Sequence, residues 1–268
     1  MIDLGTGSPV VLVPGIQGRW EWMRPAVTAL AARARVISFS LPGEPGSDTA
    51  FNPSEGLDGL VAQIDVALDR AGVAAAAICG VSFGGLIALR YAATRPERTR
   101  ALVLVSTPGP DWMMSPQLRR SISHPWLLLP QFCLGAGARA WQELSETFAN
   151  RWERIRMAGR CARLVMAAPT TPTRMSQRAA SALGLDFAAA CARVDAPTLI
   201  LTGDPAMDRV VPAATTLEYA RLIREACTGR LEATGHFGVI TKPQQFANLV
   251  ADFVRRAETS RREWGTAS

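Results

Sequence analysis

Lysine is nearly absent from this chain, and histidine and tyrosine are scarce. Lys242 is the single lysine among 268 residues, beside two histidines and two tyrosines. The net charge of +6 therefore comes from arginines, which are scattered and form no run of five or six like charges. Proteins that bind nucleic acid carry their basic residues as a patch or stripe. We therefore expect no nucleic-acid partner.

The cysteines lack the spacing that metal sites use. They stand at positions 79, 133, 161, 191 and 227, without a C-x-x-C pair, and only His124 and His236 could join them as nitrogen ligands. Zinc sites combine such ligands at short, regular spacings. We expect no metal and no organic cofactor, and we expect free thiols in a reducing compartment.

Long apolar runs are missing as well. No run reaches the roughly 20 residues that a helix needs to cross a bilayer, and the N-terminus shows neither the basic start nor the apolar stretch of a secretory leader. A hydrophobic content of 48% with 19% charged residues is typical of a globular fold. We therefore expect a cytoplasmic protein without a membrane span.

The chain does contain short apolar runs that alternate with amphipathic helical patterns. The predicted strands are 9–13, 35–39, 74–79, 101–105, 198–201 and 230–233, and the predicted helices are 25–33, 54–71, 86–94, 213–226 and 243–256. Such alternation predicts the α/β class, with a mostly parallel sheet of about six strands and helices on both faces.

One long stretch interrupts this alternation. Residues 107–195 contain helical patterns and four tryptophans but no good strand. We interpret them as a helical cap inserted into a core formed by residues 1–106 and 196–257. The polar tail 258–268 is expected to fray.

The sequence Gly80-Val81-Ser82-Phe83-Gly84 joins a predicted strand to a predicted helix. A strand that turns sharply into a helix strains the backbone of its turn residue, and small residues two positions before and after relieve the crowding. The turn lifts the Ser82 hydroxyl to the top of the sheet, as in the nucleophile elbow G-x-S-x-G. A phosphate-binding loop would instead need G-x-x-x-x-G-K-[ST], and no lysine is near.

A serine hydroxyl needs a base to accept its proton and an acid to orient that base. His236 follows the last predicted strand and is flanked by glycines, as suits an exposed loop base, whereas His124 precedes a proline within the insertion. For the acid, Asp204 and Asp208 both follow the strand 198–201. The order Ser, Asp, His along the chain is the one that this topology requires.

These motifs together resemble the α/β-hydrolase fold family, in its branch of esterases, cofactor-free haloperoxidases and C–C-bond hydrolases. The resemblance runs from "PVVLVPGIQG" to "GHFGVITKPQQFANLVADFV". It implies that Asp208, in "DRVVP", is the acid of a Ser-His-Asp catalytic triad. The gap from Gly203 to Asp208 is two residues longer than is usual in the family. Asp204 stays the alternative acid.

The resemblance also implies an oxyanion hole formed by the backbone N–H groups of Ile16 and Phe83. Pro14 stands where the family usually has a histidine, so the hydrogen bonding inside this loop must differ. The family usually has two further strands before Pro9, where this chain has eight residues. We therefore predict that the N-terminal hairpin is missing or vestigial.

The expected reaction is hydrolysis of a small apolar ester or related acyl compound through an acyl-enzyme at Ser82, with a carboxylesterase-like specificity. Residues expected to line the pocket are Gln17, Trp112, Met113, Trp126, Phe132 and Phe237. For Trp112, Met113, Trp126 and Phe132, plain packing between the insertion helices is the alternative. The same triad would serve C–C bond hydrolysis, acyl transfer or perhydrolysis, and a ligand receptor without turnover is a further alternative. The sequence leaves the oligomeric state open.

Overall fold

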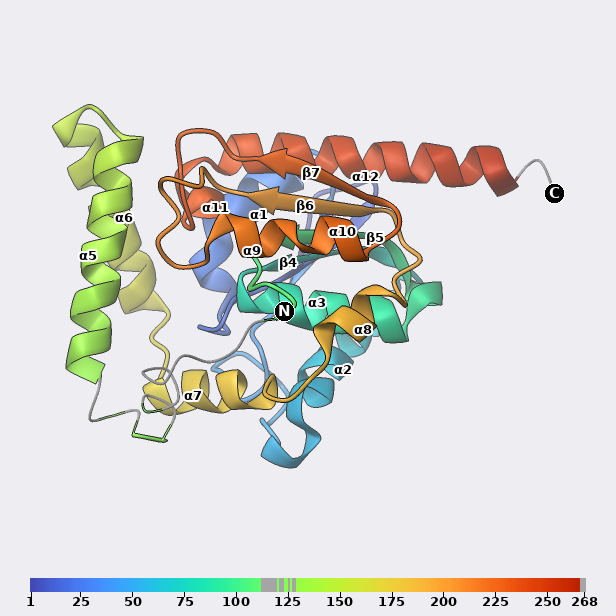
Figure 1. Ribbon diagram of the computed structural model, residues 1–268, viewed down its shortest axis with the longest axis horizontal. Coiled ribbons are helices and arrows are strands. Elements are labelled where there is room, and N and C mark those ends of the chain that lie inside the picture. The colour runs from blue at the N-terminus through green and yellow to red at the C-terminus, as the bar shows by residue number, and fades with distance from the viewer. Residues whose placement is uncertain (112–119, 121–122, 125, 127–128, 266–268) are drawn as a thin grey trace.

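A seven-stranded, mostly parallel sheet forms the centre of the molecule. The computed structural model describes residues 1–111, 120, 123–124, 126 and 129–265 (Figure 1). The strands, in chain order, are β1 (Ile2–Leu4), β2 (Pro9–Val13), β3 (Arg35–Ser38), β4 (Ala76–Val81), β5 (Thr99–Val105), β6 (Thr198–Thr202) and β7 (Ala226–Arg230). They lie in the order β1-β3-β2-β4-β5-β6-β7.

Six of these strands run parallel, as the sequence predicts, and β1 pairs antiparallel with β3. The register places Ile2 opposite Ser38 and Leu4 opposite Val36. A three-residue edge strand thus stands in place of the N-terminal hairpin, in agreement with a vestigial element.

The prediction of the last strand was wrong in position. We expected a strand at 230–233 and a helix through residue 226, but β7 occupies Ala226–Arg230. β7 is the edge strand beside β6, and all five of its residues are exposed or half-buried. It therefore lacks the apolar run by which the buried strands are recognised.

Helices cover both faces of the sheet (Figure 1). One layer contains α1 (Arg24–Ala31) and α12 (Pro243–Gly265), which pack on alternate strand residues such as Val10, Leu12 and Val103. The other layer contains α2 (Gly56–Arg70), α3 (Phe83–Thr94) and α8 (Phe187–Cys191), which pack on the intervening strand residues. The nearly complete burial of α3 fixes its N-terminus against the end of β4, where Ser82 lies.

The remaining elements are short helices and the insertion. η1 (Trp20–Met23), η2 (Pro53–Glu55) and η3 (Pro96–Arg98) are single turns, and α9 (Ala213–Leu217), α10 (Tyr219–Leu222) and α11 (Gly238–Thr241) flank β7 along the chain. Between β5 and β6 lie α5 (Leu129–Thr147), α6 (Arg151–Ala167), α7 (Pro172–Ser181) and α8, and no strand occurs there among the described residues. α5 and α6 stand side by side beyond the carboxyl ends of β6 and β7 (Figure 1).

α12 continues as a helix to Gly265, through residues for which we predicted a frayed end. Among the residues that the structure describes, no helix is both long and apolar enough to cross a membrane.

Candidate active site

Three chemically reactive side chains follow three different strands. Ser82 comes directly after β4, Asp208 lies beyond the end of β6, and His236 lies beyond the end of β7. Because these strands are parallel, their carboxyl ends lie at the same edge of the sheet, which is where open α/β sheets bind ligands. The three residues thus meet at one edge although they are far apart along the chain.

Ser82 occupies a strained turn. Its backbone has φ 54° and ψ −124°, a region that L-residues rarely adopt and that costs about 1–3 kcal/mol. Gly84 is needed beside it, because a Cβ there would lie 2.5 Å from the carbonyl oxygens of Val13 and Pro14. A Cβ on Gly80 would lie still closer to the carbonyl oxygen of Gly84, so a glycine is needed there as well. The predicted elbow is therefore present, with α3 beginning at Phe83.

Ser82, His236 and Asp208 form a continuous chain of polar contacts. Nε2 of His236 lies 3.2 Å from Oγ of Ser82, and Nδ1 of His236 lies 3.3 Å from Oδ2 of Asp208. The side chains of His236 and Asp208 are 11% and 1% exposed. A hydroxyl, an imidazole and a buried carboxylate in this order can move a proton from the hydroxyl to the ring.

The Asp208 carboxylate is held by more than the imidazole. Its Oδ1 accepts hydrogen bonds from the backbone N–H groups of Val210 and Val211, at 3.0 and 2.9 Å. Burial opposes ionisation of Asp208, but the bond to His236, the histidine charge and the two amides prevail and lower its pKa. The carboxyl group is therefore held in its charged form, as orientation of an imidazole requires.

The competing residues lie elsewhere. Oδ1 of Asp204 accepts a hydrogen bond from the N–H of Ala206, so that this side chain closes its own turn. His124 is exposed on the insertion. The structure thus brings Asp208, and not Asp204, to His236.

The loop expected to form part of an oxyanion hole lies beside Ser82. A Cβ built on Gly15 would lie 3.6 Å from Cβ of Ser82. Phe83 is the first residue of α3, so its N–H has no acceptor within the helix. The N–H groups of Ile16 and Phe83 stay the predicted donors.

A buried arginine of the insertion holds this loop. Nη1 of Arg178, in α7, donates to the Ile16 carbonyl at 3.0 Å, and its Nη2 lies 2.6 Å from Oε1 of Glu44. Both side chains are almost fully buried. Burial lowers the pKa of Arg178, against the opposing charge of Glu44.

The predicted pocket residues are placed unevenly. Gln17 lies near Ser82, because its Oε1 would be 3.1 Å from a Cβ on Gly15. The Phe237 ring packs edge-on against His236, with ring centroids 6.0 Å apart. Trp126 is 61% exposed. Trp112, Met113 and the side chain of Phe132 lie outside the described residues, so their role stays a prediction.

Two charged residues at the site were missed from the sequence. Arg178 and Glu143, both 1% exposed, come from helices of the insertion and contact the loops that carry Ile16 and His236. Neither belongs to a motif. A single charge in an amphipathic helix is ordinarily a solvated residue, so the sequence carries no signal for them.

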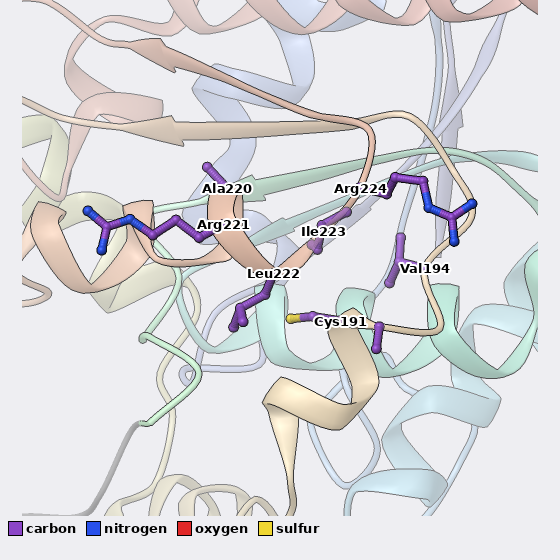
Figure 2. Close-up of a pocket in the computed structure, with 8 residues that line it drawn as sticks. Cys191, Val194, Ala220, Arg221, Leu222, Ile223 and Arg224 are labelled. Carbon is purple, nitrogen blue, oxygen red and sulfur yellow. The ribbon is translucent and has the colours of Figure 1, made fainter.

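A surface depression lies between the segments that precede β6 and β7 (Figure 2). Its lining residues include Cys191 and Val194, which precede β6, and Ala220 and Arg224, which precede β7. They therefore lie at the amino edge of the parallel strands. None of Ser82, Asp208 and His236 lines this depression.

Comparison with known proteins agrees with this fold. The family model of the alpha/beta hydrolase fold matches residues 8–243. The polyketide synthase ThaQ of Burkholderia thailandensis is 31% identical over 262 residues, which cover 93% of this chain but only 12% of that protein. The poly(3-hydroxyalkanoate) depolymerase of Ectopseudomonas oleovorans is 28% identical over 262 residues, covering 93% of this chain and 85% of the depolymerase.

The fold is also seen in a solved structure. An esterase from Exiguobacterium antarcticum superposes with a TM-score of 0.78 at 18% sequence identity, over 95% of this chain and 94% of the esterase. The chain belongs to the α/β hydrolase fold family.

Proposed function

We propose that this protein is a serine hydrolase that cleaves a small apolar carboxylic ester or related acyl compound. The observation that carries the proposal is the chain of contacts from Ser82 through His236 to the ionised Asp208. The similarity to a poly(3-hydroxyalkanoate) depolymerase, which the chain covers to 85%, supports an ester substrate because that polymer is a polyester.

In the proposed reaction, Oγ of Ser82 attacks the acyl carbon while Nε2 of His236 takes the hydroxyl proton. Asp208 accepts the Nδ1–H of the ring and stabilises the imidazolium that forms. The N–H groups of Ile16 and Phe83 bind the developing oxyanion, each worth on the order of 3 kcal/mol of barrier lowering. The protonated His236 then gives its proton to the leaving group.

An acyl-enzyme at Ser82 remains after the leaving group departs. His236 takes a proton from water, the resulting hydroxide equivalent attacks the acyl carbon, and the proton returns to Oγ of Ser82 as the acid leaves. No cofactor enters these steps. Helices α5 and α6 of the insertion lie beyond the carboxyl ends of β6 and β7 (Figure 1), and in this proposal they form walls for the acyl group.

A series of p-nitrophenyl esters from acetate to palmitate, measured with wild type and Ser82→Ala, tests the proposal. We expect saturable turnover with a preference among chain lengths, and a loss of kcat on the order of 10⁶ in the variant. Equal turnover by folded wild type and variant would refute it. Analysis of the products with an added alcohol separates hydrolysis from acyl transfer at the same triad.

A further inference from the structure

A buried glutamate of the insertion binds the loop that carries His236. Oε1 of Glu143, in α5, accepts hydrogen bonds from the backbone N–H of Gly235 at 2.8 Å and of Phe237 at 3.0 Å. The hydroxyl of Thr234 donates to the same oxygen at 3.1 Å. One carboxylate oxygen thus holds the residues on both sides of His236.

The contact is closely fitted. Glu143 is 1% exposed, and a Cβ on Gly235 would lie 2.7 Å from its Oε2. A glycine before the histidine therefore leaves room for the carboxylate. Because the Thr234 proton is donated to Glu143, the Thr234 hydroxyl accepts a hydrogen bond from the Thr241 hydroxyl, 2.6 Å away. These bonds connect Glu143 to both ends of the short His236 loop.

A second glutamate of α5 binds the loop that carries Asp208. Oε1 and Oε2 of Glu146 lie 2.7 and 2.9 Å from the two terminal nitrogens of Arg209, the residue after Asp208. This bidentate pair is geometrically specific. Glu143 and Glu146 are three residues apart, so they project from the same face of α5.

We propose that α5 positions the base and the acid of the triad through Glu143 and Glu146. The inference rests on the proposed function, in which His236 and Asp208 act together. Both residues lie on loops, and loops are the most mobile parts of a fold. A misplacement of about 1 Å can cost on the order of 100-fold in rate, so contacts that fix both loops affect turnover directly.

Burial raises the pKa of Glu143, while the bonds from Phe237, Gly235 and Thr234 and the charge of His236 act in the opposite direction. The pKa of the Cys161 thiol in α6 is raised, mainly by burial and to a smaller extent by the charge of Glu143. A carboxylate kept here against its desolvation cost is consistent with a positioning role rather than with a gain in stability.

Two substitutions separate the position of the Glu143 acceptor oxygen from its charge. Glu143→Gln keeps an acceptor oxygen at the same distance and removes the charge, whereas Glu143→Asp keeps the charge and withdraws the oxygens by one methylene. Because Glu143 acts by positioning the His236 loop, we expect the kcat of Glu143→Gln to stay within about fivefold of wild type. The kcat of Glu143→Asp and Glu143→Ala should fall about 10- to 100-fold, with KM nearly constant. Glu153→Ala, at an exposed glutamate of α6, is the matched control and should be unchanged.

Any one of three kinetic results at Glu143 would overturn the proposal. One is a folded Glu143→Ala with wild-type kcat. Another is a Glu143→Gln as inactive as Glu143→Ala beside an active Glu143→Asp, since charge alone would then matter. The third is a rise in KM at constant kcat. Should Glu143→Ala fail to fold, Glu146→Ala removes the half-exposed partner of Arg209 instead. We expect the kcat of Glu146→Ala to fall about three- to tenfold. An unchanged kcat would contradict the proposal.

Ser82→Ala and a proton NMR spectrum complete the panel. Equal turnover by wild type and Ser82→Ala would reject the proposed function, whereas a wild-type rate in Glu143→Asp beside an inactive Ser82→Ala would reject only the positioning role.

The Nδ1–H resonance of His236 reports its bond to Asp208 without any turnover. We expect this resonance in wild type and Glu143→Gln and its loss in Glu143→Asp; an unchanged resonance in all three contradicts the proposal.

Discussion

Nε2 of His236 lies 3.2 Å from Oγ of Ser82, although 154 residues separate them along the chain. The distance is at the long end of the hydrogen-bond range, as is common for catalytic pairs without substrate. The contact depends on the parallel order of β4 and β7 in the sheet, on the strained turn at Ser82 and on the loop held by Glu143. Substitutions at each of these points have distinct expected outcomes.

The two aspartates after β6 provide a matched pair. Asp208→Asn should lower kcat on the order of 10⁴, because an amide cannot hold the imidazole in the required tautomer. Asp204→Asn should stay within about threefold of wild type, since the amide oxygen can still accept from Ala206. Steady-state kinetics on one ester checks both. The reverse ranking would make Asp204 the acid and contradict the observed geometry.

The elbow can be tested with two glycines. Gly84→Ala forces a methyl group against the carbonyls of Val13 and Pro14, and we expect a loss of about 3 kcal/mol in the free energy of unfolding together with the loss of activity. Gly159→Ala, in α6 with open space around it, should be stabilising by up to about 1 kcal/mol. Urea unfolding monitored by circular dichroism measures both. A Gly84→Ala as stable and active as wild type would disprove the crowding at this turn.

The buried pair Arg178–Glu44 should matter for stability as well as for the Ile16 loop. Arg178→Met leaves the Glu44 carboxylate buried without its main partner, which should cost about 3–5 kcal/mol. Arg174→Met, which removes a half-exposed arginine 3.5 Å from the other Glu44 oxygen, should cost less than about 1 kcal/mol. Denaturant midpoints measure the stability of both variants. An equal loss in Arg178→Met and Arg174→Met would contradict the idea that the more deeply buried arginine contributes more.

Glu143 predicts a particular pH dependence of stability. Its pKa in the folded protein is raised above the ordinary 4.5, so the folded state binds the proton more tightly than the unfolded state does. The resulting contribution is fully present below pH 4.5 and is lost as the pH rises through the raised value. The free energy of unfolding of wild type relative to Glu143→Gln should therefore decrease with pH across this window. A difference that grows with pH would reverse the assigned sign.

The sequence was most informative where the backbone itself is constrained. The glycines around Ser82 and the buried strands 9–13 and 101–105 are visible because close approach and burial restrict residue choice. β7 was misplaced because Cys227 and Thr228 are exposed on an edge strand, so no apolar run distinguishes it. Burial and pairing in a folded sheet, rather than local pattern, define such a strand.

The candidate triad could be chosen from few residues, since two histidines leave little choice of base. The choice between Asp204 and Asp208 required geometry, because both follow the same strand. Glu143 and Arg178 were not predictable, since their roles depend on how the insertion helices dock on the core. Contacts of that kind join residues more than 90 positions apart and leave no short motif.

Covalent labelling of Ser82 tests the central claim most directly. Intact protein is treated with a fluorophosphonate, digested and mapped by mass spectrometry, with His236→Ala as the comparison. We predict a single rapid adduct on the peptide that contains Ser82, slowed by at least about a thousandfold in His236→Ala because the hydroxyl then has no base. Folded wild-type protein that stays unlabelled at Ser82, or that reacts equally fast without His236, would contradict the account.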